Sequence, residues 1–175
     1  MREHASWLGQ LLKELEESSQ AGTEAVQYLR ARGVRLGIHD QPTAARWTLG
    51  RNIELHPRYA QGSAKAPYAL SLVVHEIQHL RQGLTTALSV YGELDAWQVQ
   101  FNFLRALAGR YPGTAEQARL IRELLGLPLG WDRAVLRSAR GLMQRYAGKR
   151  YRIDLLPLYP LRHELLYGIS RQRPG

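Results

Sequence analysis

The sequence predicts an α+β fold that is mostly helical, with one small sheet packed on a central helix and a helical C-terminal extension. Apolar residues recur at helical spacing through most of the 175-residue chain, whereas strand-like alternation is confined to residues 34–56. A hydrophobic content of 45% lets a chain of this length bury a core. We expect one domain over residues 1–175, with its core at about 34–108, N-terminal helices at 6–32 and an extension at 109–175.

The first third of the chain predicts two helices and three short strands. Ser6 is expected to cap a first helix whose apolar residues keep helical period, namely Trp7, Leu8, Leu11, Leu12 and Leu15. A second helix is expected from Thr23 to Arg32, closed by Gly33. Alternation predicts strands near residues 34–38, 46–49 and 53–56, the last two joined by a hairpin-like turn at Gly50-Arg51-Asn52.

Helices are expected through the rest of the chain. Pro67 suits a first helical position and Gly83 follows the last turn, which predicts a helix over residues 67–82. Residues 89–108 predict a strong helix, with a core stripe of Leu94, Trp97, Phe101, Leu104 and Ala108. Thr114 and Gln117 are a candidate capping box for a helix that ends at Gly126, and a further helix spans about residues 132–147.

Composition narrows the classes of protein to which the chain can belong. It has no cysteine, which excludes disulfides, thiolate metal ligands and a cysteine nucleophile. The chain has no apolar run of about 18 residues, so no membrane-spanning helix is predicted. The N-terminal residues lack the apolar segment of a signal peptide, so we expect a cytoplasmic location.

The net charge of +9 is concentrated in the C-terminal third. Residues 1–108 hold 11 Lys/Arg against 10 Asp/Glu, whereas residues 109–175 hold 13 against 5, a net of +8. The basic stripe on and after the last expected helix comprises Arg133, Arg137, Arg140, Arg145, Lys149, Arg150 and Arg152. Such a stripe could contact nucleic acid, an anionic membrane surface or an acidic partner. We favour a solvated helix face, because characteristic nucleic-acid motifs are missing.

The most informative residues are His75-Glu76-Ile77-Gln78-His79, which spell H-E-x-x-H. Because residues four apart lie on the same face of a helix, His75 and His79 can bind one metal ion. Glu76 lies next to that face, within reach of a water molecule activated by the metal. The pattern is typical of zinc-dependent hydrolases. The alternative is a pair of ordinary helix histidines, one of them satisfied in the core.

Two histidines do not complete a catalytic zinc site, which usually has three protein ligands. Glu93 and Asp95 are the leading candidates for the third, because they lie on the next expected helix, 14 and 16 residues after His79. Packing Trp97 into the core would aim Glu93 at the same interface. A carboxylate in a first helical turn can also simply interact with the helix dipole. The remaining candidates are His4, His39, His56 and His163.

The order of a strand (Asn52-Ile-Glu-Leu-His56), the H-E-x-x-H helix and a helix that begins Glu93-Leu-Asp-Ala-Trp97 resembles the zincin metallopeptidases. The resemblance covers about residues 34–108 and is closest to the gluzincin type, including small bacterial zincin-like proteins. The chain lacks the third histidine of the metzincin signature. It also departs from the N-E-x-x-x-D form of thermolysin-like enzymes, since Trp97 stands four residues after Glu93.

This resemblance implies a zincin-like fold and a Zn²⁺ site with His75, His79 and Glu93 as ligands. Glu76 would be the general base of a metalloprotease that hydrolyses peptide bonds. Asp95 would orient a ligating histidine. The strand at Ile53–His56 would pair with an extended peptide or protein substrate, as the edge strand of zincins does.

Other roles and functions stay open from the sequence. Candidate donors to the oxyanion of the reaction are Tyr68, Tyr91 and His163, each of which could equally be a packed or surface residue. A second class of function is a zincin-like regulatory or binding protein without peptidase activity, which contacts nucleic acid through its basic C-terminal region. A third is a helical basic binding protein in which the motif is accidental.

Overall fold

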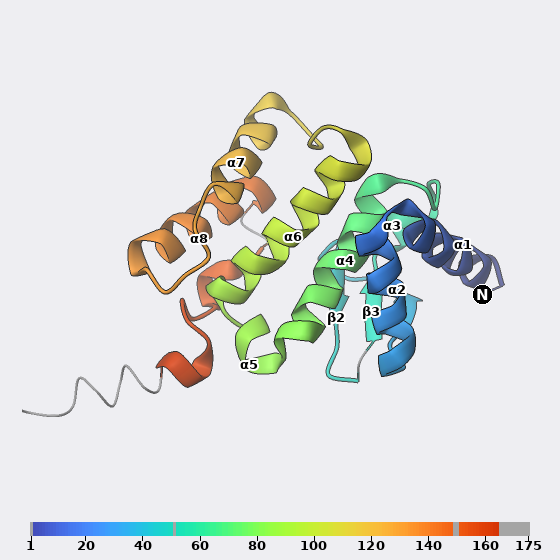
Figure 1. Cartoon of the computed structure of the whole chain (residues 1–175), viewed down its shortest axis with the longest axis horizontal. Coiled ribbons are helices and arrows are strands. Elements are labelled where there is room, and N and C mark those ends of the chain that lie inside the picture. The colour runs from blue at the N-terminus through green and yellow to red at the C-terminus, as the bar shows by residue number, and fades with distance from the viewer. Residues whose placement is uncertain (1, 51, 149–150, 165–175) are drawn as a thin grey trace, which may run out of the picture.

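The computed structural model describes residues 2–50, 52–148 and 151–164, and these confirm an α+β fold that is mostly helical (Figure 1). The helices are α1 (Arg2–Ser18), α2 (Gln20–Arg32), α3 (Pro57–Ala60), α4 (Pro67–Gln82), α5 (Leu84–Ala87), α6 (Val90–Ala108), α7 (Ala115–Leu125), α8 (Arg133–Ala147) and the 3₁₀ turn η1 (Ile153–Leu155). The strands are β1 (Arg35–Ile38), β2 (Ala45–Trp47) and β3 (Asn52–Leu55). None of the described helices combines the length and apolar character needed to cross a bilayer.

The sheet has the order β1-β3-β2, with β3 parallel to β1 and antiparallel to β2. The hairpin expected between the last two strands is therefore present, although Arg51 in its turn lies outside the described residues. The expectation that residues 53–56 form an edge strand is wrong, because β3 is paired on both sides. Because β3 pairs with β1 on one side and with β2 on the other, the edge strand that faces the rest of the molecule is β2.

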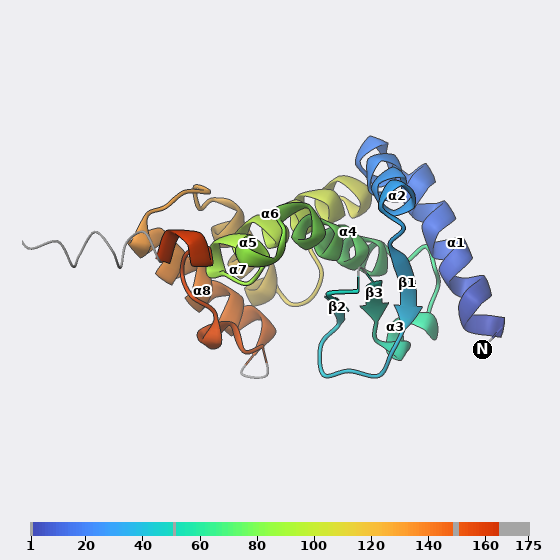
Figure 2. The ribbon, with the colours of Figure 1, turned by 90° about the horizontal axis from the view of Figure 1, so that it is seen from below.

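Helices α4 and α6 lie side by side through the middle of the molecule, with α1, α2 and the sheet on one side and α7 and α8 on the other (Figures 1 and 2). Each side has its own hydrophobic cluster. The first includes Leu11, Leu15, Ile53, Leu55 and Ile77. The second includes Leu94, Phe101, Ile121, Leu136 and Met143. The α4–α6 pair is thus held from both sides, which gives residues at its interface fixed positions.

Several helix ends follow the expected capping signals and two do not. Thr114 and Gln117 form the expected capping box of α7, and Pro67 begins α4. Ser6 lies inside α1 rather than at its start. The second helix begins at Gln20 instead of Thr23, because the hydroxyl of Ser19 accepts a hydrogen bond from the backbone N–H of Gly22.

The link after α4 forms a short helix, α5, that brings α6 back against α4. Gly83, with φ of 75°, ends α4 in a backbone conformation that favours glycine. Gly92 makes the return tight, since a Cβ atom there would lie 2.1 Å from the carbonyl oxygen of Thr86. This close approach places the first turns of α6 against the last turns of α4, where the motif histidines lie.

Candidate metal centre

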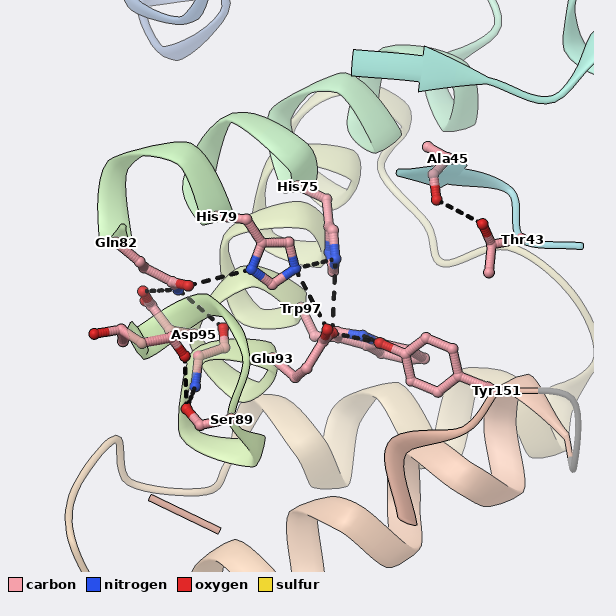
Figure 3. Close-up of polar contacts among 12 residues, drawn as sticks. Thr43, Ala45, His75, His79, Gln82, Ser89, Glu93, Asp95, Trp97 and Tyr151 are labelled. Carbon is pink, nitrogen blue, oxygen red and sulfur yellow. Dashed lines mark hydrogen bonds and ion pairs between the residues drawn. The ribbon is translucent and has the colours of Figure 1, made fainter. Parts of the chain in front are cut away.

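The structure brings His75, His79 and Glu93 together at the α4–α6 interface (Figure 3). The two Nε2 atoms of the histidines are 3.0 Å apart. The Glu93 carboxylate lies 3.5 Å from Nε2 of His79 and 3.8 Å from Nε2 of His75. One ligand atom from each residue fits within 4.8 Å of the others, a spacing that could hold a metal ion.

The chemistry of these donors suits a divalent metal such as zinc. Burial, followed by the neighbouring His79, holds the pKa of His75 well below its usual value, so its imidazole is neutral as a ligand must be. His75 and His79 are only 8% and 3% exposed. Two neutral imidazoles and one carboxylate leave net positive charge on a bound Zn²⁺, which is the donor set of many catalytic zinc sites.

Glu93 is oriented by a short chain of hydrogen bonds from the C-terminal part of the protein. The hydroxyl of Tyr151 donates to Oε2 of Glu93, and Nε1 of Trp97 donates to that hydroxyl over 3.0 Å. Burial and the adjacent Glu93 raise the pKa of Tyr151 well above its usual value, so the phenol stays neutral. Trp97 therefore packs in the core as expected, and it also supports Glu93 through Tyr151.

His79 is oriented by Gln82, one turn further along α4. The Gln82 amide nitrogen donates to the Gly92 carbonyl over 2.9 Å and to Asp95 Oδ2 over 2.7 Å. Its oxygen is thereby turned toward Nδ1 of His79, 3.2 Å away. Nδ1 must then carry the proton, which leaves the lone pair of Nε2 free for a metal.

Asp95 therefore lies one step further from the histidines than the sequence interpretation placed it. Its carboxylate accepts hydrogen bonds from Gln78 and Gln82, each over 2.7 Å, and it acts on His79 only through Gln82. Glu93, two residues earlier on α6, is the carboxylate that faces both imidazoles.

The role of Gln82 can be tested by replacing it with methionine, which has similar length and no amide. We expect Gln82→Met to weaken zinc binding by roughly 10- to 100-fold, because Nδ1 of His79 loses its acceptor. Competition with a chromophoric chelator measures this affinity. Gln78→Met is the matched control, since Gln78 lies on the same helix and bonds the same Asp95 without contacting a histidine. Equal losses in both variants would contradict the assigned role.

Glu76 is buried beside the cluster, with 5% of its surface exposed, and it is not one of the three clustered ligands. Burial, and secondarily the charge of Glu93, raises its pKa to about 8, while a backbone hydrogen bond at Trp47 acts in the opposite direction. A cation bound next to it would favour the carboxylate and lower this pKa. A carboxyl group whose pKa is shifted toward neutrality is suited to accept and release a proton.

The cluster and Glu76 lie in a cleft of about 690 Å³. One wall is the segment from Pro42 to Leu49, which contains β2. The opposite wall comes from α6 and from Tyr146, Ala147 and Tyr151 of the C-terminal extension. The extension thus completes the site through Tyr146, Ala147 and Tyr151, whereas the sequence interpretation had named only His163 from this part of the chain as a site residue.

The candidate oxyanion donors are placed differently from one another. Tyr68 lines the cleft two turns before His75, and burial followed by the neighbouring Tyr146 raises its pKa. Tyr91 and His163 stack on Trp131, with ring centroids 4.4 and 4.0 Å from it, and line a different pocket. The structure does not bring these two residues into the cleft.

The other histidines and the basic stripe lie away from the cluster. His56 caps α3, His39 contacts the Asp40 carbonyl, and His4 lies in α1. Within the stripe, Arg140 donates to the Leu156 carbonyl and Arg145 lies 3.7 Å from Glu123. Lys149 and Arg150 lie outside the described residues.

Sequence reasoning missed Gln82 and Tyr151. Gln82 stands three residues after His79, so helical spacing alone could have marked it as a neighbour. Tyr151 carries no such signal, because it meets Glu93 across 58 residues of sequence.

Known proteins offer no further guide to this cleft. Comparisons with protein-family models, with curated proteins and with solved structures give no match to the chain.

Proposed function

We propose that this protein is a zinc-dependent peptidase of the zincin class and of the gluzincin type. The observation that carries the proposal is the meeting of His75, His79 and Glu93 beside the buried Glu76 on the floor of a cleft. Metal ligands alone would serve a structural site. A separate buried carboxyl group beside them, that of Glu76, supports hydrolysis because it can accept and release a proton.

The edge of β2 that points away from β3 supports an extended peptide as the substrate. Register pairs Arg46 with Glu54, and the flanking bonds run from His56 N–H to Ala44 and from Thr48 N–H to Asn52. In an antiparallel pair of strands, residues that hydrogen-bond to the partner strand alternate with residues that do not. The backbone N–H and C=O groups of Ala45 and Trp47 therefore point away from β3. These two residues line the cleft, where the Ala45 carbonyl accepts a hydrogen bond from the Thr43 hydroxyl and a backbone hydrogen bond at Trp47 reaches Glu76. A peptide that adds here as a further strand would replace these two contacts.

Within the cleft, the residues divide the work of hydrolysis. Zinc bound by His75, His79 and Glu93 would polarise the peptide carbonyl and bring the pKa of a water molecule to about 7. Glu76 takes a proton from that water as its oxygen bonds to the carbonyl carbon. Glu76 then delivers this proton to the departing amine nitrogen as the C–N bond breaks. The single hydroxyl proton of Tyr151 is donated to Glu93, so Tyr151 holds this ligand in position during the reaction.

Metal dependence tests the proposal. Protein stripped of metal with a chelator is expected to leave a broad mixture of unfolded peptides intact, and stoichiometric Zn²⁺ is expected to restore cleavage. Mass spectrometry of the peptide products measures both states. Hydrolysis that persists without metal, or zinc-loaded protein that cleaves no peptide in the mixture, would contradict the proposal.

A further inference from the structure

Three solvent-exposed leucines rim one end of the cleft. Leu49 is 78% exposed, Leu84 is 46% exposed and Leu88 is 40% exposed, and all three line the cleft. The described part of the chain has seven exposed large apolar side chains, and three of them line this one cleft. Gathered apolar exposure of this kind marks a binding surface more often than isolated exposed residues do.

The order of the elements places this leucine rim (Leu49, Leu84 and Leu88) beyond His79. Helix α4 runs along the cleft from Tyr68 to His79, and α5 follows it, with Leu84 at its start and Leu88 directly after its end. Strand β2 ends at Trp47, whose ring centroid is 6.4 Å from that of His79, and Leu49 follows.

The opposite end of the cleft has a different chemistry. It begins near the start of α4, where Tyr68 lines the cleft together with Tyr146 and the exposed Arg58. The chain enters β2 at this end, because Ala44 bonds His56, two residues before Arg58. Exposed leucines therefore gather on the His79 side of the metal ligands, whereas the other side combines these phenols and the guanidinium with the apolar Leu72 and Phe101.

Resting on the proposed function, we propose that the cleft selects peptides with a large apolar residue on the N-terminal side of the cleaved bond. A peptide that adds antiparallel to β2 runs opposite to it. Because β2 runs toward the leucine rim, the N-terminal half of such a peptide lies on that rim. A leucine or phenylalanine side chain there covers apolar surface that is otherwise in water.

Matched peptides test this selectivity. A peptide with leucine immediately before the cleaved bond is expected to have a kcat/KM roughly 10- to 100-fold higher than the same peptide with asparagine there. Moving the leucine to the C-terminal side of the bond is expected to give no such gain. Equal rates for all three peptides, or a preference only for the C-terminal leucine, would overturn the inference.

Variants of the rim supply the second arm of the test. Leu84→Asn combined with Leu88→Asn is expected to remove most of the preference for leucine over asparagine. Leu129→Asn combined with Leu155→Asn is the matched control, since these leucines are 43% and 66% exposed and do not line the cleft. An equal loss of this preference in the control pair would contradict the proposed role of the leucine rim.

Binding separates this inference from the proposed function. In a Glu76→Gln background, fluorescence anisotropy of labelled peptides measures affinity without cleavage, and the leucine peptide is expected to bind roughly 10-fold or more tightly than the asparagine peptide. Cleavage without any apolar preference would sink the inference alone. If the leucine peptide binds more tightly but the protein with Glu76 intact cleaves no peptide, the proposed function is contradicted. The leucine rim would then be a recognition surface only.

Discussion

Replacing Glu76 with glutamine is expected to lower kcat for peptide hydrolysis by roughly 10²- to 10⁴-fold, the range in which a general base contributes. Glutamine has the same shape but cannot take a proton from water. Zinc content should stay unchanged, because Glu76 is not among the three residues whose ligand atoms cluster. Product formation by mass spectrometry and zinc content by atomic emission, on the same samples, check both halves of the expectation.

Two further variants sharpen this test. Glu76→Asp keeps a carboxylate but withdraws it by one methylene, so an intermediate rate is expected. Glu24→Gln removes an exposed carboxylate from α2, far from the cleft, and should leave the rate unchanged. Full activity in Glu76→Gln would show that another group moves the proton. Loss of zinc from it would show that Glu76 holds the metal instead.

Local spacing explains why part of this site was predictable from sequence. His75 and His79 share a face because they are four residues apart on α4, whose start at Pro67 and end at Gly83 are marked by single residues. Glu93 follows on the next helix after a short return. These positions depend on residues that are close in sequence, and helical periodicity predicts them.

Long-range relations were not predictable. The position of β3 between β1 and β2 depends on a parallel pairing that no local pattern announces. Tyr151 reaches Glu93 only because α7 and α8 pack on α6 and return the chain to the cleft. The C-terminal extension therefore looked peripheral in the sequence, although it supplies one wall of the site.

Binding of zinc is expected to stabilise the protein, because the metal-free site holds two buried imidazoles and the buried Glu76 close to the partly exposed carboxylate of Glu93. At zinc concentrations about 100 times the dissociation constant, the gain is about 2.7 kcal/mol. For a chain of this length that corresponds to a rise in Tm of roughly 5–10 °C. His79→Ala should abolish the zinc-dependent rise, whereas His39→Ala, which removes an exposed histidine outside the cluster, should keep it. Differential scanning calorimetry with and without zinc measures the shift.

Calorimetric titration of zinc into metal-free protein tests the central claim most directly. We predict one zinc per chain for the wild type and for His39→Ala. His79→Ala and Glu93→Ala should each bind far more weakly, because each leaves two of the three ligands. Wild-type protein that takes up no zinc, or variants that bind it as tightly as the wild type does, would contradict the metal centre and the hydrolase built on it.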